Sequence, residues 1–67
     1  MKTYKIGTVQ HPAALIIKAE AMRQAITIAA ERLGARVGEE YIIDENYARI
    51  EFIKNRSAIL VIQRAFY

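Results

Sequence analysis

The sequence predicts an α+β domain: a small antiparallel sheet with one helix packed across one face and a β-meander at the C-terminus. The chain has 67 residues, which is short enough for a single domain over residues 1–67. Apolar side chains recur at helical spacing up to Gly34, where a helix is expected to stop. After Gly38 the apolar positions alternate as they do in strands.

The first strand is expected at residues 4–9, which are rich in β-forming side chains. Tyr4, Ile6 and Thr8 would share one face of this strand, because side chains alternate between faces. The strand is expected to end before Pro12, which lacks a backbone N–H.

Residues 13–33 allow two interpretations. In the first, Pro12 occupies the first helical position and one helix runs to Leu33. In the second, residues 14–18 form a buried strand and the helix begins near Ala21, although no Ser, Thr, Asp or Asn is available there as an N-cap. We favour the second, because a helix of about 13 residues spans roughly 20 Å and matches strands of about six residues. In either case the inner face of the helix includes Met22, Ile26, Ala29 and Leu33.

A hairpin is expected over residues 41–54, with strands at 41–43 and 47–54. Its turn is Asp44-Glu45-Asn46, in which Asn46 suits the left-handed conformation of a three-residue turn. In the second strand, alternation directs Ala48, Ile50 and Phe52 inward and Arg49 and Glu51 toward water.

The last strand is expected over residues 57–66, after a turn at Asn55-Arg56, and its core at residues 59–62 is apolar on both faces. One helix covers only one face of a sheet, so either Leu60 and Ile62 or their alternates lie on a face that nothing else in the chain covers. Leu60 and Ile62 are therefore the candidate dimer face. A homodimer also suits a chain of this size, because it has no cysteine for a disulfide.

The sequence favours a protein that is not an enzyme and needs no cofactor or metal. His11, Ser57 and Asp44 would have to converge from three separate turns to form a hydrolytic triad, and no motif supplies an oxyanion hole. The acidic residues within 39–45 lack the ligand spacing of a calcium loop, so a solvated acidic loop is expected. Residues 34–38 follow a helix and are expected to be a helix-to-strand connection, not a phosphate-binding loop.

The chain is mildly basic, with a formal net charge of +3 and a sequence pI near 9.5. Basic ribbons can enter a DNA groove, and aromatic side chains can stack on single-stranded bases. Glu51 shares a face with Arg49 and lowers the positive field, so a solvated face is favoured over a nucleic-acid surface. The candidate binding surface of the C-terminal hairpin consists of Tyr47, Arg49, Lys54, Arg56 and Arg64.

Residues 17–26 (IKAEAMRQAI), which lead to Leu33-Gly34 and a following hairpin, resemble the strand-into-helix element of small accessory proteins of phages and mobile elements. Some anti-CRISPR proteins belong to this group. The resemblance implies a non-enzymatic protein that blocks or modulates a larger host machine. It assigns no functional residue.

These observations predict a small interaction or regulatory protein that binds a larger protein partner through its surface, as a homodimer. The alternative is a nucleic-acid-binding module that uses the basic C-terminal hairpin. No membrane association is expected, because Lys18, Glu20 and Arg23 interrupt the only long apolar region. The lack of cysteine and of a signal peptide is compatible with a cytoplasmic location.

Overall fold

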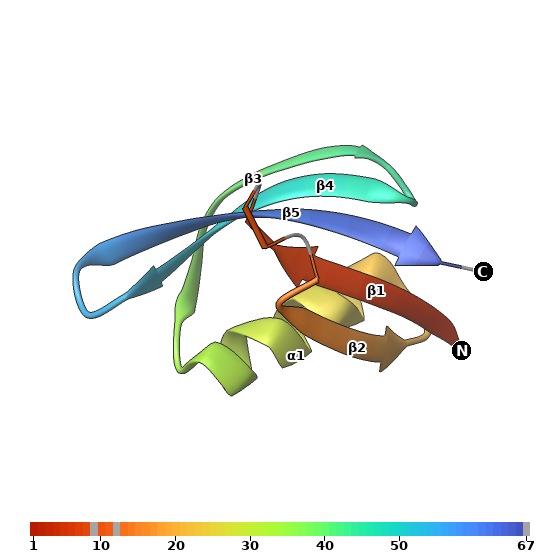
Figure 1. Ribbon diagram of the computed structural model, residues 1–67, viewed down its shortest axis with the longest axis horizontal. Coiled ribbons are helices and arrows are strands. Elements are labelled where there is room, and N and C mark those ends of the chain that lie inside the picture. The colour runs from red at the N-terminus through yellow and green to blue at the C-terminus, as the bar shows by residue number, and fades with distance from the viewer. Residues whose placement is uncertain (9, 12, 67) are drawn as a thin grey trace.

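A computed structural model describes residues 1–8, 10–11 and 13–66, and within them it shows one helix and a five-stranded antiparallel sheet (Figure 1). The predicted α+β class and the C-terminal β-meander are confirmed. The strands are Lys2–Gly7 (β1), Leu15–Ala19 (β2), Arg36–Asp44 (β3), Tyr47–Lys54 (β4) and Ser57–Phe66 (β5), and the helix is Met22–Leu33 (α1).

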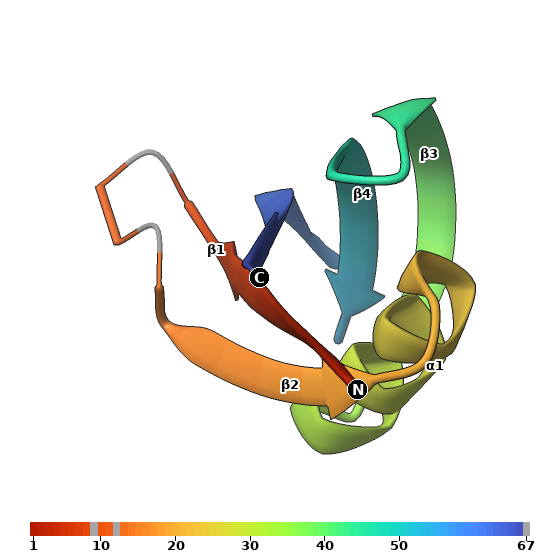
Figure 2. The ribbon, with the colours of Figure 1, turned by 90° about the vertical axis from the view of Figure 1, so that its right-hand side faces the viewer.

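The strands lie in the order β2-β1-β5-β4-β3, and every neighbouring pair is antiparallel. Pairing of β1 with β5 joins the two ends of the chain and places β5 at the centre of the sheet. The curved sheet holds α1 against one face, and α1 contacts both edge strands, β2 and β3 (Figure 2).

The first strand differs from its prediction at both ends. Tyr4 and Ile6 are buried as expected, but β1 starts at Lys2 and stops at Gly7. Thr8 lies beyond the strand because it bonds within a tight loop: its N–H donates to the carbonyl of His11, and its Oγ1 accepts from the N–H of His11, both at 3.0 Å. The predicted positions Val9 and Pro12 fall outside the described residues.

The shorter of the two predicted helices is confirmed, because residues 15–19 form strand β2. Ala21 precedes the helix in an extended conformation without a side-chain cap. Gln24 reaches back instead, and its Oε1 accepts the backbone N–H of Glu20 at 2.8 Å. This bond resembles the back-reaching half of a capping box: it holds the chain that leads into the helix, but it satisfies none of the first N–H groups of the helix itself.

The helix ends at Gly34, which has a φ of 63° in the left-handed region. The N–H of Gly34 donates to the carbonyl of Glu31 at 3.2 Å, and the N–H of Ala35 donates to that of Ala30 at 2.9 Å. These two bonds form a Schellman motif, which satisfies carbonyls that would otherwise lack partners.

The core lies between α1 and the concave face of the sheet. Met22, Ile26 and Ala29 are buried as predicted, whereas Leu33 is half-buried at the helix end. The position that the sequence missed is Ala25, whose small side chain lets the helix approach the sheet closely. The core consists of Tyr4, Ile6, Ile17, Ala19, Met22, Ala25, Ile26, Ala29, Ala48, Ile50, Phe52 and Val61.

Strand β3 is much longer than its predicted range of 41–43. It starts at Arg36, so the predicted connection at 34–38 shrinks to two residues, and the expected acidic loop is in part a strand. The β3–β4 register shifts between Val37 and Glu40. Gly38 lies in this irregular stretch, where an added Cβ would lie 2.9 Å from Cδ1 of Ile53. Gly38 therefore permits a close approach inside a strand, and its interpretation as a strand boundary was wrong.

The two hairpin turns differ from the prediction in which of them contains residues with positive φ. Among the described non-glycine residues, positive φ occurs only at Asn55 (50°) and Arg56 (68°), so the left-handed conformation expected at Asn46 is wrong. The N–H of Asn46 instead donates to Oδ1 of Asp44 at 2.6 Å. The predicted turn at Asn55-Arg56 is confirmed, and its two positive φ values match the turn type that two-residue hairpins prefer.

Candidate interaction surface

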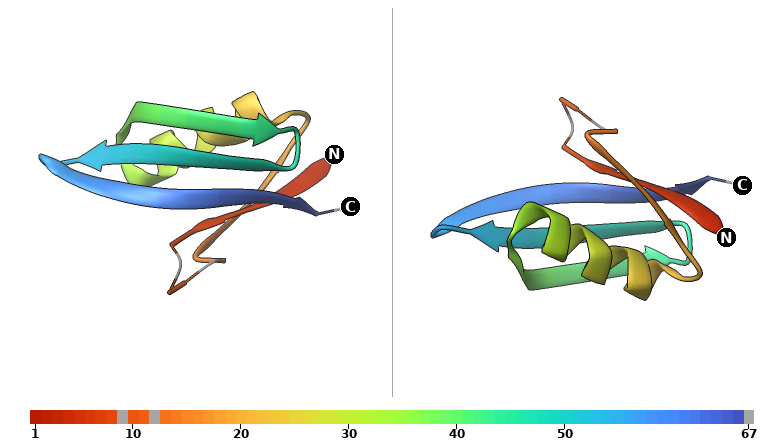
Figure 3. Two further views of the ribbon diagram at one scale, coloured as in Figure 1. Left: turned by 90° about the horizontal axis from the view of Figure 1, so that it is seen from above. Right: turned by 90° about the horizontal axis from the view of Figure 1, so that it is seen from below.

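The face of β3, β4 and β5 that points away from α1 is called the open face here. On β4, Ala48, Ile50 and Phe52 are fully buried against the core, so the alternate residues Arg49 and Glu51 project from the open face, as predicted. Figure 3 (left) looks onto this side, with α1 behind the three strands. The open face therefore presents its side chains outward.

Four residues at the centre of the open face form two cross-strand pairs. Arg49 lies opposite Ile62, and Glu51 lies opposite Leu60. Directly opposed side chains have Cβ atoms about 4.5–5.5 Å apart, and residues two apart on a strand are about 7 Å apart. We call these four residues the open-face square. Its diagonals each join one charged and one apolar corner.

The four side chains of the open-face square are partly or fully exposed to solvent. Leu60 is 51% exposed, which is high for a leucine on a central strand. Arg49 is exposed, whereas Glu51 and Ile62 are half-buried. The predicted dimer residues Leu60 and Ile62 thus lie on the face that α1 leaves uncovered, and Val61 is buried in the core.

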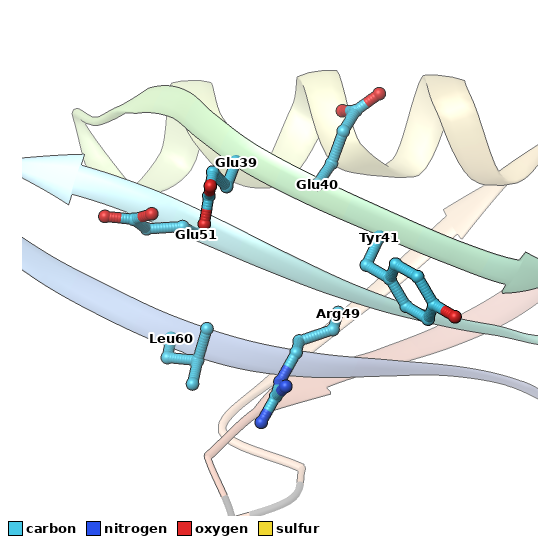
Figure 4. A pocket seen from close by; sticks show the side chains of 6 residues that line it. All are labelled: Glu39, Glu40, Tyr41, Arg49, Glu51 and Leu60. Carbon is cyan, nitrogen blue, oxygen red and sulfur yellow. The ribbon is translucent and has the colours of Figure 1, made fainter.

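A shallow hollow of about 470 Å³ lies over this region. Figure 4 shows Glu39 of β3 beside Glu51 of β4, whereas Glu40 points toward α1. Tyr41 lies opposite Arg49 and extends the hollow toward the sheet edge. The residues that line it are Glu39, Glu40, Tyr41, Arg49, Glu51 and Leu60.

The charges of the open face form no ion pair within the described part of the chain. The ion pairs found there join Lys2 to Glu45 at 3.9 Å and Arg23 to Glu40 at 2.5 Å. Neither pair includes Arg49, Glu51 or Glu39. These charges are therefore available to groups outside this chain.

The two edges of the sheet differ. Strand β2 has five residues and carries an exposed lysine, Lys18, two features with which natural proteins protect an edge from further pairing. Strand β3 has nine residues, eight of them exposed, and no lysine. Its protection consists of two register shifts, and the pairing from Glu40 to Ile42 is regular between them.

Strand β3 also carries three consecutive exposed apolar residues. Tyr41 is 67% exposed, Ile42 44% and Ile43 58%. Runs of this kind on a strand edge mark either an aggregation site or a binding site. The sequence predicted strand at these positions but missed the edge, because strand order depends on pairing between distant segments.

The predicted basic surface is not one cluster. Lys54 and Arg56 lie at the β4–β5 turn, which projects beyond α1 (Figure 1). Tyr47 lies opposite Arg64 at the other end of β4, about 23 Å away for a rise of about 3.3 Å per residue. Arg49 stands two positions along β4 from Tyr47, so Tyr47, Arg49 and Arg64 occupy neighbouring positions on the two strands. The predicted surface thus divides into this group and the pair Lys54 and Arg56.

The residues considered for catalysis are also far apart. Asp44 pairs with one end of β4 and Ser57 with the other, about 23 Å apart by strand rise. In the described residues, no group of three His, Cys, Asp or Glu side chains is placed to hold a metal ion. No helix in the described part of the chain is long and apolar enough to cross a membrane.

Comparison of the chain with family models, with curated proteins and with solved structures finds no match. The resemblance to accessory proteins of phages and mobile elements therefore stays a prediction.

Proposed function

We propose that this chain is a small non-enzymatic regulatory protein that binds an extended segment of a larger protein along β3. The observation that carries the proposal is the exposed nine-residue edge, in which Tyr41, Ile42 and Ile43 are consecutive exposed apolar residues. An extended segment that adds to such an edge gains main-chain hydrogen bonds from the backbone and specificity from alternate side chains.

The regular stretch of β3 is the part best suited to strand addition. Between Glu40 and Ile42 the strand pairs with β4 without interruption, so its outer backbone groups follow normal strand spacing. The side chain of Tyr41 projects on the open face, opposite Arg49, and Ile42 lies on the side of buried Ala48. An added strand would thus find an apolar neighbour on each face of the sheet.

The charge of β3 favours a basic partner segment. The strand contains one basic residue, Arg36, and three acidic residues, Glu39, Glu40 and Asp44, for a formal charge of −2, and Arg23 of α1 pairs with one of them, Glu40. Complementary charge steers association and opposes wrong partners. The expected segment therefore combines Lys or Arg with β-branched or aromatic residues.

Selection from a displayed random library of peptides about ten residues long tests the proposal. Ile43→Lys places a charge on the β3 edge. Ile16→Lys is the matched control, because Ile16 is 54% exposed, close to the 58% of Ile43, and lies on the opposite edge strand, β2. Basic, β-forming peptides should be enriched on the unmodified protein, and Ile43→Lys should weaken their binding at least about tenfold. Ile16→Lys should leave their affinity unchanged.

Equal losses in both variants, or selected peptides that are acidic or helical, would contradict strand addition at β3. Circular dichroism of both variants checks that the fold is retained, as expected for substitutions at exposed positions.

A further inference from the structure

We propose that a second copy of this chain packs on the open face. The two copies are related by a two-fold axis that lies parallel to the sheet and perpendicular to its strands. The proposal rests on the open-face square and is independent of strand addition at β3. In this proposal the predicted dimer face, Leu60 and Ile62, packs against a second copy of the chain through the contacts described below.

The square is complementary to itself under this rotation. The axis passes between the row of Arg49 and Ile62 and the row of Glu51 and Leu60, so it exchanges the two rows. Arg49 of one copy then faces Glu51 of the other, and Ile62 faces Leu60. Each contact occurs twice, giving two ion pairs and two apolar contacts from four residues.

The neighbouring residues of β3 fit the same rotation. Tyr41 extends the row of Arg49, and Glu39 lies beside Glu51 in the other row (Figure 4). The rotation therefore brings the Tyr41 hydroxyl, a hydrogen-bond donor, over the carboxylate of Glu39 in the second copy. The charges that lack partners within the described chain thus gain them from the second copy.

The size of the face limits the interface. The two longest dimensions of the molecule, 34 Å and 21 Å, bound one face at about 710 Å², which lies in the lower part of the roughly 600–1,000 Å² that a standard interface buries on each partner. Two sheets packed face to face also bury Leu60, which is otherwise half exposed on a central strand. The outer edge of β3 stays accessible in this arrangement, because the copies stack along the sheet normal.

Charge reversal tests the contact between Arg49 and Glu51. Analytical ultracentrifugation of the unmodified chain at micromolar concentration should show a dimer. Arg49→Glu and Glu51→Arg each place like charges together twice, so each should raise the dimer dissociation constant at least about tenfold. Arg32→Glu, at an exposed position of α1, is the matched control for net charge and should leave dimerisation unchanged.

Mixing the two charge-reversed variants tests the contact between Arg49 and Glu51 most sharply. Equal amounts of Arg49→Glu and Glu51→Arg protein carry opposite charges at both ion-pair contacts, so they should form a heterodimer although each alone dissociates. The double variant Arg49→Glu/Glu51→Arg should also recover the dimer. A monomer of the unmodified chain at all concentrations, dimers unaffected by single reversal, or no recovery in the mixture and the double variant would overturn the proposal.

Discussion

Arg23 and Glu40 join the first turn of α1 to strand β3, with Nη1 of the arginine 2.5 Å from Oε1 of the glutamate. This pair links the edge strand β3 to the helix, which covers the face of the sheet opposite the open face. The arginine side chain is 66% exposed and the glutamate 27%, so solvent screens their attraction. The pair orients β3 relative to α1 but contributes little to the free energy of unfolding.

Replacing Arg23 by alanine should therefore lower the free energy of unfolding by less than about 1 kcal/mol. Urea titration measures this change, and Glu40→Gln should give a similar value. In a double-mutant cycle the coupling energy should also stay below about 1 kcal/mol. A loss above about 3 kcal/mol would show that the pair behaves as a buried one.

Ile26→Ala should lower the free energy of unfolding far more than Arg23→Ala does. Ile26 is 2% exposed in the centre of the helix face, so its truncation removes buried area and leaves a cavity. The expected loss is about 2–5 kcal/mol. Arg23→Ala, on the exposed side of the same helix, is the control in the same titration. Small and equal effects at both positions would mean that the helix packs through a different face.

Tyr4→Phe should leave stability unchanged or raise it. Tyr4 is fully buried, and its hydroxyl has no hydrogen-bond partner among the described atoms. A buried unsatisfied polar group costs about 1–3 kcal/mol, so its removal relieves a penalty. Tyr47→Phe, at a half-buried tyrosine outside the open-face square, is the control. A clear loss of stability in Tyr4→Phe would reveal a hydrogen bond to this hydroxyl.

Local signals in the sequence predicted much of the fold. The helix stop at Gly34 and the two-residue turn at Asn55-Arg56 each depend on backbone conformations that short segments encode. Alternation on β4 placed Ala48, Ile50 and Phe52 in the core, where all are fully buried. The helix start near Ala21 followed from length matching, although its cap was absent.

The order of the strands could not be predicted in the same way. Pairing of β1 with β5 joins residues about sixty positions apart in the chain, and no local pattern specifies that contact. The length of β3 was missed because Gly38 usually interrupts a strand, whereas here it accommodates Ile53 within one. Strand order makes β3 an edge and strand length sets how much of it is exposed, so the candidate binding edge was the part of the site least accessible to sequence reasoning.

The alternative function, nucleic-acid binding, makes a separate prediction. Lys54 and Arg56 are two basic residues of the predicted surface that lie together at the exposed β4–β5 turn. Duplex and single-stranded nucleic acids should fail to bind at about 10 μM protein in about 150 mM salt, where non-specific binders already associate. Fluorescence anisotropy measures this.

Micromolar binding that disappears in the Lys54→Ala/Arg56→Ala double variant would favour the alternative. In that case the slope of log affinity against log salt should fall by roughly 0.7–0.9 for each phosphate contact removed. Because phosphate contacts carry no base specificity, the loss should be similar for all sequences.

Amide hydrogen exchange measures directly whether β3 accepts an added strand. A peptide selected on the unmodified protein should slow exchange at alternate amides of β3, by at least about tenfold, because those amides gain hydrogen-bond acceptors from the added strand. Amides of β2, at the opposite edge, should be unchanged. Slowed exchange on β2 or at the β4–β5 turn, with the amides of β3 unaffected, would contradict strand addition at β3.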